Sequence, residues 1–274
     1  MERSSEELKR LAKVVRKDIL NMTFQSGVNG GHIGGALSSA DILAVLYGKT
    51  LNITPENPTD PDRDRFILSK GHVAIAHYAV LAECGFIPKE ELDTFEKSGS
   101  ELPTHEVMDI RKGIEVSSGS LGYGLSIGVG CALDAKRKDK DYRVYVLLGD
   151  GECNEGSVWE ATMAAVKFKL DNLTIIIDVN KQQLDGYTAD IMPISNFKQI
   201  FEGYGCNVVE VNGNEVDELM KAFDTISKDK PTVVLAYTMK GKGIESIEGE
   251  LGWHHVRISE EQYNNFVEEL EGRL

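Results

Sequence analysis

The sequence is poor in positive charge. Its 274 residues include 30 Lys and Arg against 44 Asp and Glu, which gives a formal net charge of −14. That sign opposes attraction to nucleic acid and to an anionic membrane surface, so we expect neither as a partner. An anionic ligand would therefore need local positive charge from a metal ion, a lysine or a histidine.

Cysteines and long apolar runs are also scarce. The four cysteines form no CxxC unit, so we expect free thiols in a reducing compartment rather than a redox or zinc site. No stretch approaches the roughly 18 apolar residues that a membrane span needs. The first residues are amphipathic and charged throughout, unlike a secretory signal. These features predict a cytoplasmic protein.

The second half of the sequence alternates strand and helix patterns. Short β-rich apolar runs lie at 144–148, 174–178, 207–211 and 233–237, and helical patterns lie at 157–170, 195–205 and 214–228. Runs this apolar are typical of strands covered on both faces, as in a parallel sheet. The pattern predicts a doubly wound, mostly parallel α/β sheet flanked by helices. Without a convincing linker or repeat, we predict a single domain over 1–274.

The first half predicts helices separated by loops. Ser4 and Glu7 form a capping box that opens a helix, and a glycine-rich break follows at 27–35. Further segments are a helix at 38–51, a loop at 52–65, a helix from after His72 to Gly85, and a short helix at 89–97 after Pro88.

Polar residues follow the predicted strands. Asp150, flanked by Gly149 and Gly151, ends the first run, and Asn180 follows the next. Parallel neighbours would bring both to one edge of the sheet. A carboxylate with an amide oxygen suits Mg²⁺ or Ca²⁺ completed by phosphate oxygens, and glycines let a phosphate approach backbone N–H groups. The alternative is that Asp150 only caps a helix.

Histidines in loops provide a second indication. His32, His72 and His105 lie in glycine-rich or loop contexts, whereas His77 fits a helix interior and is interpreted as structural. Such histidines can be simply solvated, but several together favour a polar pocket that hydrogen-bonds sugars and phosphates. The segment 117–130, rich in serine and glycine, indicates either close approach to a ligand or a tightly packed helix entry.

Together these segments resemble the N-terminal, diphosphate-binding half of transketolase. The landmarks occur in order along essentially the whole chain: GGHIGG at 30–35, DRFILSKGH at 64–72, LPTHEV at 102–107, SSGSLGYGLSIGVG at 117–130, GDGECNEG at 149–156, DVNKQQLDG at 178–186, TMKGKGI at 238–244 and WHH at 253–255. The GDG-to-Asn segment is shared by many thiamine diphosphate enzymes, whereas the spaced histidines are more specific to transketolase.

The resemblance implies roles for individual residues. It implies that thiamine diphosphate binds with Mg²⁺ or Ca²⁺, the metal being held by Asp150, Asn180 and the backbone carbonyl of Gln182. It implies cofactor contacts at Gly35, His72, Gly119, Ser120, Leu121, Gly149, Gly151, Lys240 and His254. It places His32, His105 and His254 at the sugar as catalytic residues. Glu155 and Glu160 match acidic residues that link two cofactor sites, although a favourable charge at a helix N-terminus explains them equally well.

The resemblance also implies a second chain. A full transketolase is more than twice this long, and its catalytic Glu belongs to a middle domain that has no counterpart here. We therefore expect the N-terminal subunit of a split transketolase, active on sugar phosphates only with a C-terminal subunit that supplies the pyrimidine-binding domain and that Glu. An α2β2 heterotetramer is implied.

Three positions depart from the family pattern. Ile33 stands where Pro is usual, Tyr123 where Gln is frequent, and His255 where Gly is common. Because all three lie near the expected pocket, the sugar stays open, and a sulfonated or branched ketose is an alternative substrate. A non-catalytic, cofactor-binding or regulatory chain is the other alternative.

Overall fold

A computed structural model describes residues 3–272 of the chain. Its centre is a five-stranded parallel sheet in the order β1-β2-β3-β5-β4. The strands are β1 (Arg65–Leu68), β2 (Val144–Gly149), β3 (Leu173–Val179), β4 (Asn207–Asn212) and β5 (Thr232–Tyr237). The predicted class, a mostly parallel α/β sheet flanked by helices, is confirmed.

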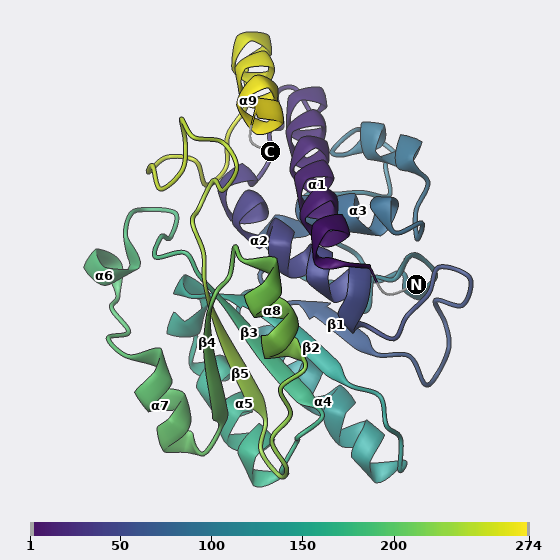
Figure 1. Cartoon of the computed structure of the whole chain (residues 1–274), viewed down its shortest axis with the longest axis vertical. Helices are drawn as coiled ribbons and strands as arrows, with labels where there is room; N and C mark the ends of the chain where they lie inside the picture. The colour runs from purple at the N-terminus through teal and green to yellow at the C-terminus, as the bar shows by residue number, and fades with distance from the viewer. Residues whose placement is uncertain (1–2, 273–274) are drawn as a thin grey trace.

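Helices cover both faces of the sheet. The apolar layer on one face includes α2 (Ile33–Val45), α3 (Ala74–Glu83) and α8 (Val216–Phe223); α1 (Ser5–Gln25) packs against these helices, and α9 (Glu260–Gly272) packs against α1. The other face packs against α4 (Tyr123–Arg137), α5 (Gly156–Lys167) and α7 (Phe197–Tyr204). Figure 1 shows α8 on the near side of the sheet and α5 on the far side. Strand side chains alternate between these two apolar layers, which explains why the strands read as unbroken apolar runs.

Short helical segments complete the described structure. They are the π-helical turn η1 (Leu46–Thr50), the 3₁₀ segments η2 (Gly71–Val73), η3 (Lys89–Thr94), η4 (Ile110–Lys112) and η5 (Gly151–Asn154), and α6 (Thr188–Ile191). No helix within residues 3–272 is long and apolar enough to cross a membrane. The four cysteines are free thiols, as predicted.

The helix expected at 38–51 begins earlier than predicted. The capping box of Ser4 and Glu7 does open α1, but α2 starts at Ile33, inside the segment interpreted as a glycine-rich break. Gly34 is needed there for another reason: a Cβ at that position would lie 2.4 Å from the carbonyl oxygen of Trp253. The glycine allows close packing of a loop against a continuous helix, rather than interrupting the helix.

Strand β1 and helix α9 are among the elements that were not predicted. Strand β1 has only four residues and follows a charged loop, so its apolar run is too short to be recognised as a strand from the sequence. Helix α9 does carry a recognisable signal, because Ser259 and Gln262 exchange hydrogen bonds of 2.9 and 3.1 Å in a capping box. The expected single domain over 1–274 stays a prediction, although all five described strands belong to one sheet.

Candidate functional site

The site lies at the carboxyl ends of β1, β2, β3 and β5. The register aligns Gly149 of β2 with Asp178 of β3, and Asp178 with Ala236 of β5. A pocket of about 320 Å³ opens beyond this edge. The predicted residues that line it are Gly35, His72, His105, Gly119, Leu121, Gly149, Asp150, Gly151, Asn180, Gln182, Lys240 and His254. Parallel strands therefore collect residues from most of the chain at one place.

Four predicted residues do not line this pocket. His32 lies against its histidine wall, with ring centroids 5.4 Å from His72 and from His254. Ser120 lines a neighbouring hollow that shares Gly119 with the pocket. Glu155 and Glu160 are exposed at the start of α5 and on its surface. The structure thus brings the metal and diphosphate candidates together but leaves both glutamates on the outside.

Asp150 is a buried carboxylate with few partners. Only 4% of the residue is exposed, and in the described part of the chain its oxygens accept the backbone N–H groups of Gly151 at 2.8 Å and Lys181 at 2.6 Å. Burial and the nearby charge of Asp178 raise the pKa of Asp150 to about 7. Asp150 also caps η5, so the cap interpretation holds locally. A cap alone does not account for so costly a buried charge.

Asn180 and Gln182 supply oxygens beside Asp150. The side-chain oxygen of Asn180 accepts the backbone N–H of Gln182 at 3.1 Å. The Gln182 side chain donates to the Gly249 carbonyl at 2.7 Å, while its own amide oxygen is buried without a hydrogen-bond partner in the described structure. Residues 3–272 contain no cluster of three His, Cys, Asp or Glu side chains suited to a metal. A metal bound here would therefore depend on amide and backbone oxygens.

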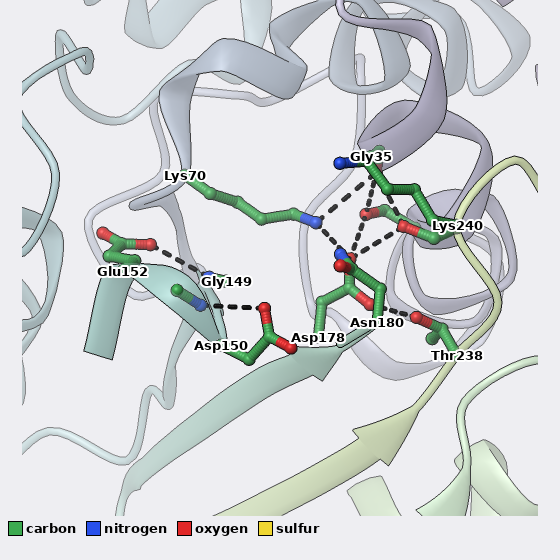
Figure 2. A network of polar contacts seen from close by, with 12 residues as sticks. Gly35, Lys70, Gly149, Asp150, Glu152, Asp178, Asn180, Thr238 and Lys240 are labelled. Atoms are coloured by element: carbon green, nitrogen blue, oxygen red, sulfur yellow. Dashed lines mark hydrogen bonds and ion pairs between the residues drawn. The ribbon is translucent and has the colours of Figure 1, made fainter. Parts of the chain in front are cut away.

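A buried ion pair at the pocket was not predicted from the sequence. Lys70 and Asp178, with side chains 1% and 0% exposed, form a salt bridge at the ends of β1 and β3. Figure 2 shows the Lys70 side chain reaching across to Asp178, with Asn180 and Thr238 beside it. Burial alone would raise the pKa of Asp178, but Lys70 outweighs it and lowers that pKa.

Glu152 is a second residue that the sequence analysis missed. Its carboxylate accepts the Ser69 hydroxyl at 2.5 Å, the Gly122 N–H at 2.8 Å and the Gly149 N–H at 3.0 Å. Burial nevertheless raises its pKa. The carboxylate thus ties together the ends of β1 and β2 and the entry of α4. Its position two residues after Asp150, in the glycine-rich segment, was the available signal.

The cationic side of the pocket is weakly charged. Burial and the charge of Lys70 lower the pKa of Lys240 to about 8. The Lys240 ammonium lies 3.4 Å from His254 Nδ1, and burial together with Lys240 lowers the pKa of His254 to about 4. Burial and Lys70 also hold the pKa of His72 well below its ordinary value. The pocket therefore holds neutral imidazoles that can donate or accept hydrogen bonds.

His32 is the centre of the histidine cluster. Its ring lies 5.8 Å from that of His105 and 4.5 Å from that of His255, measured between centroids. Burial and the charges of neighbouring histidines lower its pKa to about 3. Its Nδ1 atom is buried and has no hydrogen-bond partner in the described structure. An imidazole atom buried in this way favours a polar ligand.

The three departures from the family pattern occupy different positions. Ile33 is fully buried as the first residue of α2, so it acts in packing. Tyr123 begins α4 and is 63% exposed beside the neighbouring hollow. His255 is exposed and contacts His32, which places it alone among the three at the histidine cluster.

Comparison with known proteins identifies the family. Residues 8–270 match the family described as transketolase, thiamine diphosphate binding domain. An apulose-4-phosphate transketolase subunit from Phocaeicola vulgatus is 40% identical over 99% of this chain and 93% of its own. The 6-deoxy-6-sulfo-D-fructose transketolase subunit SqwG of Clostridium sp. is 40% identical over 97% of this chain and 96% of its own.

Larger transketolases match only in part. Human transketolase is 38% identical over 97% of this chain, a match that covers 42% of the human protein. The crystal structure of Campylobacter jejuni transketolase superposes with a TM-score of 0.87 at 31% identity, covering 97% of this chain and 43% of the other. These matches confirm the prediction of an N-terminal transketolase subunit. The chain belongs to the transketolase family, as its N-terminal, thiamine diphosphate-binding part.

Proposed function

We propose that this chain binds thiamine diphosphate through Mg²⁺ or Ca²⁺ and, with a partner subunit, transfers a two-carbon ketol unit from a ketose phosphate to an aldose. The observation that carries the proposal is Asp150. This buried carboxylate stands beside Asn180 at the edge where β2 and β3 end, and only backbone N–H groups of the described chain donate to it. A divalent cation would compensate its charge.

The donor set fits such a cation. The carboxylate of Asp150, the amide oxygen of Asn180 and the backbone carbonyl of Gln182 are hard oxygen ligands, and their small number suits a metal completed by phosphate oxygens and water. Because the metal links the chain to the diphosphate, the net charge of −14 does not oppose binding of an anionic cofactor.

The remaining diphosphate contacts come from the pocket wall. Gly149 and Gly151 leave the backbone accessible, and His72 and His254 offer neutral imidazole N–H groups. Lys240, whose pKa of about 8 leaves it mostly protonated at neutral pH, regains its ordinary basicity when an anion approaches. Gly35, Gly119, Ser120 and Leu121 meet the rest of the cofactor, chiefly through the backbone.

The histidine cluster acts on the sugar. Thiamine diphosphate, when bound, supplies the nucleophilic carbon that cleaves the ketose and carries the two-carbon unit. His32 and His254 stay neutral near physiological pH, so each ring can donate one hydrogen bond to a sugar oxygen and accept one from a sugar hydroxyl. His105 hydrogen-bonds a hydroxyl of the donor. These roles extend the family match to residues of this chain.

A partner completes the site. Two relatives of similar length are named as transketolase subunits, which supports the proposal that a C-terminal subunit supplies the pyrimidine-binding domain and the catalytic Glu. In an α2β2 heterotetramer, the exposed Glu155 and Glu160 would face a neighbouring chain and link two cofactor sites. Cytoplasmic sugar metabolism, including the pentose phosphate pathway, is the proposed setting.

A modified ketose is the second candidate donor. Two relatives at 40% identity are named for apulose-4-phosphate and for 6-deoxy-6-sulfo-D-fructose. The exposed His255 beside His32 adds a polar group that the family pattern lacks. A panel of xylulose 5-phosphate, fructose 6-phosphate and these two sugars compares the candidates, since the preferred donor has the highest kcat/KM.

Reconstitution tests the main proposal. The chain is mixed with a chain that carries the middle and C-terminal transketolase domains and is encoded beside it, and ketol transfer is measured with thiamine diphosphate and Mg²⁺. We expect activity only from the pair, lost on chelation and in the Asp150→Ala variant. Absence of transfer from every donor in the panel would contradict the proposal. Turnover that Asp150→Ala leaves unchanged would contradict the metal assignment.

A further inference from the structure

A buried polar chain lies behind the histidine wall. His77 Nδ1 lies 2.6 Å from a carboxylate oxygen of Glu106, and His77 Nε2 lies 2.6 Å from the hydroxyl of Tyr47. The side chains of His77 and Glu106 are 0% and 1% exposed. We call these three residues the Tyr47–His77–Glu106 relay. None of them lines the pocket, and the sequence predicts a structural role for His77.

The protons in the relay can be placed from chemistry. An ionised carboxylate can only accept, so His77 donates Nδ1–H to Glu106. The Nε2 atom of a neutral imidazole then accepts the hydroxyl proton of Tyr47. Burial and Glu106 raise the pKa of Tyr47 well above its ordinary value, so the hydroxyl keeps this proton. Both nitrogens of His77 are therefore satisfied, which makes the geometry of the relay specific.

The relay joins segments that form the pocket wall. Tyr47 lies in η1, which continues directly from α2, and α2 carries Gly35 and follows His32. His77 lies in α3, which begins just after His72.

Glu106 connects two further segments of the pocket wall. It follows His105 in the chain, so burial of its side chain fixes the backbone beside an exposed histidine. Its own carbonyl accepts the N–H of Ser118 at 3.0 Å, next to Gly119 in the pocket. Three separate wall segments thus meet at three side chains, and the backbone carbonyl of Glu106 links the fourth.

We propose that Tyr47, His77 and Glu106 are positioning residues that hold His105 and the segment 118–121 in the geometry that ketol transfer needs. The proposal rests on the proposed function, since it concerns the same pocket. The relay does not touch the pocket contents. It acts through the backbone of residues 105–106 and through the Ser118 hydrogen bond.

Variants of Glu106 test the proposal in the reconstituted pair. Glu106→Ala frees the 105–106 backbone, and a displacement near 1 Å at a catalytic group is enough to lower kcat/KM for the donor by about 100-fold. Glu106→Gln keeps an oxygen that can accept His77 Nδ1–H, so we expect it to retain kcat/KM within about threefold. Tyr47→Phe removes one hydroxyl and lowers kcat/KM by about three- to tenfold.

A matched control separates positioning from general stability. Arg16 and Asp41 form another buried ion pair, 2.5 Å long, on α1 and α2, and neither residue lines the pocket. Asp41→Asn is expected to lower the Tm at least as much as Glu106→Ala while keeping kcat/KM per cofactor-loaded site. If the two variants lose activity in proportion to their Tm, the relay has only a structural role and the proposal fails.

Hydrogen exchange gives a measure that does not depend on turnover. In the isolated chain, Glu106→Ala and Tyr47→Phe should speed exchange of the Ser118 amide and of its neighbours at 118–121, whereas Asp41→Asn should not. Unchanged Ser118 exchange together with unchanged kcat/KM would refute the positioning role proposed for the relay. An inactive wild-type pair whose variants still speed Ser118 exchange instead refutes the proposed function and leaves the relay in place.

Discussion

Two aspartates at neighbouring strand ends differ in how the chain treats them. Asp178 and Asp150 are 0% and 4% exposed, so burial raises the pKa of both. Lys70 and nearby hydroxyl groups overcome this effect at Asp178 and lower its pKa. Within the described chain, Asp150 accepts hydrogen bonds only from backbone N–H groups, and its pKa stays raised to about 7. The chain satisfies one carboxylate itself and leaves the other for a ligand.

The histidines repeat this contrast. Both nitrogens of His77 have partners at 2.6 Å, in Glu106 and Tyr47. His32 has a buried Nδ1 without a hydrogen-bond partner among the described residues. In each pair the satisfied member supports the fold, whereas the unsatisfied member lies in the pocket or against its histidine wall. Unmet hydrogen-bonding capacity, more than residue type, distinguishes a binding residue here.

The largest effect is expected at Asp178. The Asp178→Asn variant leaves the Lys70 ammonium buried without its counter-charge, and breaking such a pair costs about 3–5 kcal/mol of stability. Urea unfolding of the unliganded chain measures the loss. The double variant Lys70→Met with Asp178→Asn removes both charges and should be more stable than the single variant. If Asp178→Asn were as stable as wild type, Asp178 would not be a carboxylate that the folded chain depends on, and its contrast with Asp150 would fail.

Asp150→Asn should behave in the opposite way. It removes a charge that burial disfavours, so the unliganded chain should keep or gain stability. Affinity for thiamine diphosphate in the presence of Mg²⁺ should fall by more than about 100-fold, since loss of a ligand exceeds the effect of a residue that only orients one. Titration calorimetry with the reconstituted pair measures this. Asp224→Asn, at an exposed position after α8, is the matched control. Unaltered affinity in Asp150→Asn would refute the metal role.

Acid should destabilise the chain through His32. The unfolded chain binds a proton at this residue below pH 6.5, but the folded chain does so only near pH 3, so stability falls as the pH drops through that window. The loss between pH 6.5 and 5 amounts to at most about 2 kcal/mol. Denaturant unfolding of wild type and His32→Asn at pH 7 and pH 5 tests it. An equal pH dependence in both proteins would show that His32 is not held neutral.

The smallest effect concerns the hydroxyl groups around Asp178. The Ser38 hydroxyl lies 2.8 Å from its carboxylate and the Ser39 hydroxyl 3.4 Å. Ser38→Ala should cost about 1.5 kcal/mol, as for a hydrogen bond to a charged group, and Ser39→Ala should cost less. Thermal unfolding compares the two variants. A larger loss in Ser39→Ala would show that the Gly35 carbonyl, which both hydroxyls also reach, matters more.

The sequence predicted residues at the ends of recognisable strands better than residues whose partners come from other segments. Asp150 and Asn180 are identified by position, because each follows an apolar run and parallel strands align their ends. Lys70 follows β1, a strand too short to be recognised, so its pairing with Asp178 could not be inferred. The Tyr47–His77–Glu106 relay was missed for a similar reason, since its members come from separate segments whose contact depends on tertiary packing.

The strand order also bears on how the site forms during folding. Lys70 and Asp178 are separated by 108 positions along the chain, and β2 lies between β1 and β3, the strands that bring them together. Contacts of such long range form slowly, because chain entropy is lost before any attraction is gained. The pocket therefore has no local precursor and should be a late product of folding. A cofactor that binds only this completed form adds its binding energy to the last steps of assembly.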